Sequence, residues 1–255
     1  MSSDSTAFFQ TRFAPFTKAF DELSLTSPEL ETLRQYTCRF DVLNNVHALD
    51  GVADTLDPEL AQYLANVSQK RTMEFLAGRY CALRALESAG ASSECWVGRS
   101  PEGLPLWPTG WVGSVSHTGG LATAVAAPRR DFEGLGVDVE RVMPAERSDR
   151  LAEKIVAGYP LPKTELAKPT LITLVFSVKE ALYKALNPIG RLSGGFDSAD
   201  IVDWDFSRCR CLVRLRDKAV LRPEAARDYV AKFSVGADAT AALIAVSRHE
   251  SQDPQ

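Results

Sequence analysis

The sequence predicts an α+β fold, because the hydrophobic period changes along the chain. From Asp57 to about Gly90, apolar residues recur at the spacing of a helix. Beyond Gly90, the apolar residues fall in short runs that are typical of strands, separated by Gly and Pro. Helical and strand-like stretches that follow one another in this way indicate the α+β class.

The second part of the chain repeats this order loosely. A strand-like run is again followed by helical segments and then by further strand-like runs. The closing runs of the two parts, residues 122–127 and 240–246, look alike. We therefore expect two pseudo-symmetric α+β halves, residues 1–130 and 131–255, with a linker at residues 128–131.

Capping signals and periodicity place the helices. Ser27 and Asp57 each precede a proline, so both are expected to begin helices. The helix after Asp57 is amphipathic and locally basic, with Arg71 and Arg79 among its cations. Taken alone, such a segment is more often a solvated face than a binding site. The remaining expected elements are helices from about residue 148 and at 170–186, and strands at 95–98, 111–117, 121–126, 135–140, 209–215, 229–235 and 240–246.

The composition limits the classes of function. The 255 residues carry a formal net charge of −4, whereas a general nucleic-acid binder would usually be basic. The five cysteines form no C-x-x-C pair, so neither a disulfide framework nor a zinc site is indicated. No apolar run approaches the roughly 18 residues that span a bilayer, and the polar first residues lack the order of a secretory signal. We expect a cytoplasmic protein that holds any phosphate ligand locally.

A pair of carboxylates in one strand is the first feature that carries chemistry. In residues 136–140 (G-V-D-V-E), Val137 and Val139 can enter the core while Asp138 and Glu140 project together on the other side. The two negative charges repel each other. Either both are exposed to water or a bound divalent cation relieves the repulsion, and the strand alone favours neither alternative.

The helix at residues 170–186 contributes a second pair of charges. Its apolar stripe leaves Glu180 and Lys184 as neighbours on the opposite side. For a random Glu-to-Lys pair at this spacing, the expected role is a surface ion pair worth about 0.2–0.5 kcal/mol.

The turn at residues 113–120 (G-S-V-S-H-T-G-G) is the third feature. His117 ends a predicted strand, and the following glycines would let backbone N–H groups approach a phosphate. Taken alone, a satisfied structural histidine is the commoner interpretation.

Taken together, the three features resemble the 4′-phosphopantetheinyl transferases of the Sfp type, in particular the siderophore-synthase branch (enterobactin synthase component D-like). The acidic strand combined with the Lys-Glu helix is the most specific part of the resemblance. The matching blocks are residues 71–79 (R-T-M-E-F-L-A-G-R), 99–108 (R-S-P-E-G-L-P-L-W-P), 113–117, 136–140 and 176–184 (F-S-V-K-E-A-L-Y-K).

The resemblance implies a fold and an activity. The active site would lie at the interface of the two halves, with a coenzyme A-binding basic helix and the SHTGG turn in residues 1–130. The acidic strand and the Lys-Glu helix would come from residues 131–255. The implied reaction is the Mg²⁺-dependent transfer of 4′-phosphopantetheine from coenzyme A to a serine of an apo carrier protein, which releases adenosine 3′,5′-bisphosphate.

The resemblance also implies partners. These are apo carrier domains (peptidyl, aryl or acyl) of nonribosomal peptide, polyketide or siderophore synthesis. Neither nucleic acid nor membrane is implied, and a monomer is expected because two fused halves would build a complete site.

Residue roles follow from the same resemblance. Asp138, Glu140 and Glu180 would bind Mg²⁺. Glu180 would also be the general base toward the serine, and Lys184 would offset or protonate the phosphate groups. The expected contacts to coenzyme A are Arg71, Arg79, Arg99, Ser116, His117 and Lys179.

Two positions depart from the family pattern. Leu104 stands in the frequent Gly-Lys-Pro element, so Arg99 is expected to replace the missing lysine contact. Phe176 stands where the Lys-Glu helix often begins with tryptophan. Neither change removes an expected metal ligand or the expected base.

Two other functions stay open at this point. An ATP-dependent phosphoryl transferase is disfavoured, because the chain has no G-x-x-x-x-G-K-[ST] loop and no kinase-like glycine loop. A non-catalytic module that binds coenzyme A or a carrier protein is the second alternative.

Overall fold

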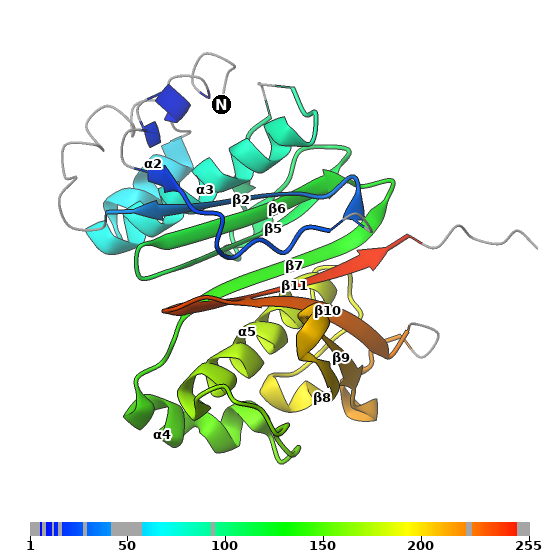
Figure 1. The fold of residues 1–255 in the computed structure, drawn as a ribbon. Helices are drawn as coiled ribbons and strands as arrows, with labels where there is room; N and C mark the ends of the chain where they lie inside the picture. Colours follow the sequence, from blue (N-terminus) through cyan, green and yellow to red (C-terminus); the bar gives the residue numbers. More distant parts are fainter. Residues whose placement is uncertain are drawn as a thin grey trace, which may run out of the picture.

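Two antiparallel sheets form the centre of the protein (Figure 1). The computed structural model describes residues 6, 9–11, 13–14, 17–27, 30–41, 58–92, 95–222 and 226–248. The first sheet has the order β1 (Thr17–Ala19), β2 (Arg34–Phe40), β6 (Leu121–Pro128), β5 (Trp111–Thr118). The second has the order β7 (Phe132–Arg141), β11 (Ala239–Ser247), β10 (Asp228–Val235), β9 (Arg210–Leu215), β8 (Ala199–Asp205).

Helices cover the two sheets, so the predicted α+β class is confirmed. Figure 1 shows α3 against the first sheet and α5 against the second, while α4 packs on α5. None of the described helices is long and apolar enough to cross a membrane. The remaining elements are α2 (Pro58–Ala65), α3 (Gln69–Ser88), α4 (Ala145–Val156), α5 (Lys168–Leu186), the hairpin β3 (Gly98–Arg99) and β4 (Pro105–Leu106), and the short helices η5 (Phe196–Ser198), η6 (Phe206–Arg208) and η7 (Asp217–Ala219).

Helix α3 begins at a side-chain cap. The backbone of Ser68 is extended, and its hydroxyl accepts a hydrogen bond from the N–H of Arg71. The predicted apolar stripe of this helix, which includes Met73, Leu76 and Leu86, is buried against the first sheet. The single helical stretch expected from Asp57 to Gly90 is therefore two helices, α2 and α3, because the Ser68 cap starts a new one.

Strand β7 has two faces with different tasks. Val137 and Val139 point into a core shared with residues of the first sheet. On the opposite face, Gly134 and Gly136 allow α5 to pack directly on the strand: a Cβ at Gly136 would lie 1.8 Å from the carbonyl oxygen of Ala181. Because side chains alternate along a strand, Asp138 shares this face and is turned toward α5.

Strands β5 and β7 are edge strands of different sheets, yet they lie side by side (Figure 1). No backbone ladder joins them among the described residues. Side-chain hydroxyls take its place, since Ser114 Oγ accepts the Val137 N–H at 3.0 Å and Ser116 Oγ accepts the Val139 N–H at 3.3 Å. The expected linker at residues 128–131 connects β6 of the first sheet to β7 of the second.

The structure corrects several expected elements. The helix expected after Ser27 falls on residues 28 and 29, which lie outside the described part; Leu30 is in a 3-10 conformation, a turn follows, and β2 begins at Arg34. The strand expected at 95–98 begins only at Gly98. Strands β1, β2 and β8 were not expected, and the hairpin strand β4 was not expected either. The strands predicted from residue 111 to 140 and from residue 209 to 246 are present, with ends shifted by up to three residues.

We expect Gly136→Ala to destabilise the protein strongly, because the added methyl group would collide with the backbone of α5 at Ala181 and Ala185. Overpacking of this kind costs about 1–3 kcal/mol or more in free energy of unfolding. Urea denaturation measures the loss. The matched control is Gly98→Ala, whose Cβ would meet only ordinary contacts with Leu106; equal stabilities of the two variants would contradict the close packing of α5 on β7.

Candidate active site

A cavity of about 550 Å³ lies where the two sheets meet along β5 and β7, lined by residues of α3, the β3–β4 hairpin, β5, β7 and α5. All of the candidate residues except Lys179 line it. They are Arg71, Arg79, Arg99, Ser116, His117, Asp138, Glu140, Glu180 and Lys184. Five segments that are far apart in the sequence therefore contribute to one site.

Three arginines make one end of the cavity cationic. Arg79 is only 5% exposed, lies 4.4 Å above the ring of Phe75 and donates to the carbonyl oxygen of Gly98 at 2.8 Å. Its Nε is buried and has no hydrogen-bond partner among the described residues. Burial, together with the charges of Arg99 and Arg71, lowers the pKa of Arg79 to about 10. An anion in the cavity would reduce the repulsion among the three arginines and could accept a hydrogen bond from Arg79 Nε.

The β3–β4 hairpin brings Arg99 to this end. The Arg99 guanidinium lies 4.0 Å above the ring of Tyr63 and packs beside Gly103, whose lack of a side chain leaves the space. Leu104, by contrast, is 46% exposed and is not among the residues that line the cavity. This placement agrees with Arg99, rather than residue 104, facing a ligand.

His117, a residue of β5, faces α3 and is neutral. The guanidinium of Arg71 lies 3.1 Å from His117 Nε2, so Nε2 accepts and the proton resides on Nδ1, which faces Glu74 at 3.7 Å. Burial, followed by the charges of Arg71, Lys184 and Arg79, lowers the pKa of His117 to about 4. At pH 7 the neutral His117 ring therefore offers one hydrogen-bond donor and one acceptor.

The opposite end of the cavity holds a buried ion pair. Asp138 is 2% exposed, and its Oδ1 accepts from Lys184 Nζ at 2.7 Å and from Ser116 Oγ at 2.8 Å. Lys184 also donates to Ser116 Oγ at 3.0 Å and to the Val137 carbonyl at 3.1 Å, which occupies all three of its N–H donors. Asp138 Oδ2 is buried and has no hydrogen-bond partner among the described side chains and backbone.

Glu140 and Glu180 share the cavity with Asp138. Burial and the negative charge of Asp138 raise the pKa of Glu140 to about 7, against the opposing effects of the Thr118 hydrogen bond and of Lys184 and Arg147. The same two causes raise the pKa of Glu180, and Lys184 opposes them. Three carboxyl groups that repel one another in a partly buried site are suited to a positively charged ligand.

The acidic end of the cavity is the part of the site that could hold a metal ion. Among the described residues, no three His, Cys, Asp or Glu side chains are grouped closely enough to make a ready metal site. Mg²⁺ does not require such a group, because it is usually held by one or two carboxylates together with waters and substrate phosphates. The unpartnered Asp138 Oδ2 and the raised pKa of Glu140 fit a hard cation at this end.

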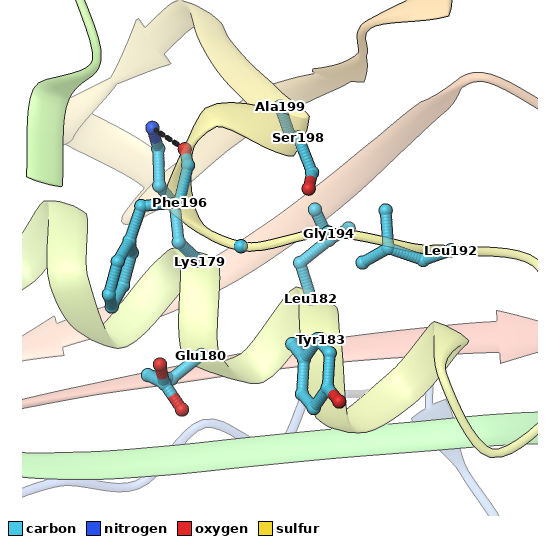
Figure 2. Close-up of a pocket in the computed structure, with 10 residues that line it drawn as sticks. Lys179, Glu180, Leu182, Tyr183, Leu192, Gly194, Phe196, Ser198 and Ala199 are labelled. Carbon is cyan, nitrogen blue, oxygen red and sulfur yellow. Dashed lines mark hydrogen bonds between the residues drawn. The ribbon is translucent and has the colours of Figure 1, made fainter. Parts of the chain in front are cut away.

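Lys179 is the candidate that the structure does not bring to this cavity. Its ammonium is turned away and donates to the carbonyl oxygen of Phe196 at 2.6 Å and to that of Val156 at 3.4 Å (Figure 2). Glu180, the next residue, points in a different direction (Figure 2). Lys179 lies beside the η5 loop and lines a second cavity, and its expected contact with a coenzyme A phosphate stays a prediction.

A second cavity of about 250 Å³ lies between α5 and the loop at residues 192–199 (Figure 2). Its lining includes the side chains of Leu182, Tyr183, Leu192 and Phe196. Glu180 lines both cavities, so the two adjoin at this residue. An elongated ligand could therefore have a charged part in the first cavity and a less polar part in the second.

Two residues of the site were missed from the sequence. Ser114 accepts the Val137 N–H, and Thr118 donates to Glu140 Oε2 at 3.1 Å. The signal that could have found them is the alternation of hydroxyl residues at positions 114, 116 and 118, which places all three on one face of a strand.

The comparison with protein-family models matches most of the chain. Residues 59–127 match the 4′-phosphopantetheinyl transferase N-terminal domain, and residues 134–238 match the 4′-phosphopantetheinyl transferase superfamily. Both large sheets carry matched residues, and so do both ends of the cavity. The chain thus belongs to the 4′-phosphopantetheinyl transferase superfamily.

Curated relatives indicate which branch of that superfamily the chain resembles. Enterobactin synthase component D of Salmonella typhi is 38% identical over 141 residues, which cover 54% of this chain and 57% of the relative. The protein of the same name from Escherichia coli O157:H7 is 34% identical over 151 residues, which cover 58% of this chain and 69% of the relative. The 4′-phosphopantetheinyl transferase Npt of Nocardia iowensis is 33% identical over 150 residues, which cover 56% of this chain and 64% of the relative.

These relatives confirm the predicted resemblance to the enterobactin synthase component D branch of the superfamily. The matched part of the chain spans a little more than half of the length of the first of these relatives.

We expect His117 to make stability depend on pH. The unfolded chain binds a proton at His117 below about pH 6.5, whereas the folded protein does so only below about pH 4, so stability falls as the pH drops between these values. Between pH 7 and pH 5 the loss amounts to about 2 kcal/mol. The free energy of unfolding of the wild type and of His117→Gln, measured at both values, isolates this effect because the other titrating groups are common to both. Parallel losses in the two proteins would contradict a neutral, buried His117.

Proposed function

We propose that this protein transfers 4′-phosphopantetheine from coenzyme A to a serine of an apo carrier protein, in a reaction that requires Mg²⁺. The observation that carries the proposal is the polarity of the first cavity, with arginines at one end and three carboxyl groups at the other. A protein with a formal net charge of −4 has little reason to hold several arginines in a partly buried cluster unless they bind an anion. Membership of the superfamily supports this assignment.

The cationic end suits the phosphate groups of coenzyme A. The nucleotide part carries a 3′-phosphate and a diphosphate, and Arg71, Arg79 and Arg99 provide planar donors that bind such groups well. His117 can donate from Nδ1, or from both nitrogens once a phosphate raises its pKa. The second cavity, which adjoins the first at Glu180, suits the pantetheine arm because much of its lining is apolar.

The chemical step is a phosphoryl transfer. The serine oxygen of the carrier forms a bond to the phosphorus next to pantetheine, and the bond from this phosphorus to the adenosine 3′,5′-bisphosphate leaving group breaks. Glu180 accepts the serine proton, and its raised pKa makes it a better base than an ordinary surface glutamate. Lys184 supplies positive charge beside Asp138, close to where the phosphoryl group would lie.

Mg²⁺ would be held at the carboxylate end by Asp138 and Glu140, with Glu180 completing the set. When bound, the ion would offset the negative charge of the diphosphate. The chain's own contribution is to fix the Asp138 carboxylate, because Lys184 and Ser116 hold its Oδ1 while its Oδ2 has no hydrogen-bond partner among the described residues.

The remaining expectations follow from this reaction. Both sheets and the residues that we assign to the site belong to the same chain, so we propose that a monomer is sufficient. The partners would be carrier proteins or carrier domains of siderophore, nonribosomal peptide or polyketide synthesis. Because these carriers and coenzyme A are found in the cytoplasm, we propose that the protein acts there.

The intact mass of an apo carrier protein tests the proposal. After incubation with this protein, coenzyme A and Mg²⁺, we expect the carrier to gain the mass of one phosphopantetheine group. The gain should disappear with EDTA and when the acceptor serine of the carrier is replaced by alanine. Binding of coenzyme A without any transfer, across a panel of peptidyl, aryl and acyl carriers, would instead favour a non-catalytic binding module.

Two substitutions should separate chemistry from binding. Glu180→Gln preserves size and removes the base, so we expect kcat to fall at least about 100-fold while the Kd for coenzyme A changes little. Arg79→Met keeps the packing on Phe75 and removes the charge, so we expect the Kd for coenzyme A to rise about tenfold or more. Single-turnover transfer and calorimetric titration measure the two effects; unchanged values in both variants would contradict these roles.

A further inference from the structure

Three hydroxyl side chains of β5 point at the acidic strand. Ser114, Ser116 and Thr118 occupy alternate positions, and each makes a hydrogen bond to β7. We call these three residues the hydroxyl row. The intervening residues Val115 and His117 face α3 instead, where a Cβ at Gly78 would lie 2.8 Å from Val115 and 3.7 Å from His117.

The hydroxyl of Ser116 has no hydrogen-bonding capacity left for a ligand. Its hydroxyl donates to Asp138 Oδ1 at 2.8 Å and accepts from Lys184 Nζ at 3.0 Å and from the Val139 N–H at 3.3 Å. A hydroxyl group has one donor and two acceptor sites, so all three are used. The expected contact of Ser116 with coenzyme A would require one of these buried bonds to break.

Ser114 and Ser116 together replace a backbone ladder. Both are almost fully buried, and both accept N–H groups of an edge strand that belongs to the other sheet. Without these acceptors, the N–H groups of Val137 and Val139 would be left buried and unpaired, which is costly. The register between β5 and β7 is therefore set by side chains.

Thr118 extends the row to the second carboxylate. Its hydroxyl donates to Glu140 Oε2 at 3.1 Å. Asp138 and Glu140 are two residues apart on β7, just as Ser116 and Thr118 are on β5. Each carboxylate thus has its own hydroxyl donor from the facing strand.

We propose that the hydroxyl row is a positioning device: it fixes β7 against β5 and so orients the carboxylates of Asp138 and Glu140 toward the cation. Ser116 serves this role instead of contacting coenzyme A. The inference rests on the proposed function for the identity of the cation, and it adds Ser114 and Thr118 as positioning residues for the reaction.

Three single substitutions should give graded effects on cation binding and stability. The variants are Ser114→Ala, Ser116→Ala and Thr118→Val. Mn²⁺ affinity in the presence of coenzyme A, followed by the EPR signal of the free ion, should fall about tenfold or more in Ser116→Ala and Thr118→Val. Ser114→Ala should change it less than about threefold, because Ser114 touches no carboxylate, and should instead lower Tm by about 3–6 °C.

Thr173→Val is the matched control. Its hydroxyl also accepts a buried backbone N–H, that of Met143 at 3.0 Å, but it does not line the cavity. We expect this variant to lower Tm as Ser114→Ala does and to keep wild-type Mn²⁺ affinity. The Kd for coenzyme A in EDTA should stay within about threefold of wild type in all four variants, since none removes a phosphate contact.

Two results would overturn the inference. A rise of the coenzyme A Kd in EDTA with unchanged Mn²⁺ affinity in Ser116→Ala would make Ser116 a coenzyme A ligand. Unchanged Mn²⁺ affinity in Thr118→Val would contradict the positioning role of the hydroxyl row. This variant is the decisive test if Ser116→Ala does not fold. A wild-type protein that transfers nothing would contradict only the proposed function, because the Mn²⁺ and Tm measurements need no turnover.

Discussion

The buried ion pair between Lys184 and Asp138 is the interaction on which the site depends. A carboxylate with 2% exposure is costly unless its charge is compensated, and Lys184 is the cation that reaches it. The pair can form only because α5 lies directly on β7, where Gly134 and Gly136 offer no side chains. One electrostatic contact therefore requires a particular helix–strand packing.

The same contact joins the two sheets. Lys184 donates to Ser116 of β5 as well as to Asp138 and Val137 of β7. Since β5 and β7 share no backbone ladder in the described part of the chain, the hydrogen bonds of Lys184 and of the serine hydroxyls carry much of the connection. The site and the junction between the sheets are thus the same set of atoms. A substitution that alters the junction between the sheets is therefore expected to alter the site as well.

The cavity separates opposite charges within a protein of modest net charge. Arg79 and its neighbours repel one another at one end, and Asp138 repels Glu140 and Glu180 at the other. Each cluster is unfavourable alone, and each would be relieved by a ligand of opposite sign. A substrate rich in phosphate, bound together with a divalent cation, satisfies both ends at once. The energetic cost of such clusters in the free protein is typical of binding sites rather than of structural cores.

The sequence by itself determined which residues share a face, because this depends only on the local period of a helix or strand. It placed Asp138 with Glu140 and Glu180 with Lys184, and most of the central elements were predicted. It missed β2, which pairs with β6 far along the chain, and it also missed β1, β4 and β8, which pair with strands nearby in the sequence. Only the tertiary structure decided which faces meet. In the folded protein Lys179 contacts the η5 loop, Ser116 donates a hydrogen bond to Asp138, and the pKa of His117 is lowered. These features depend on burial and on charges that distant segments bring close, which the local sequence does not contain.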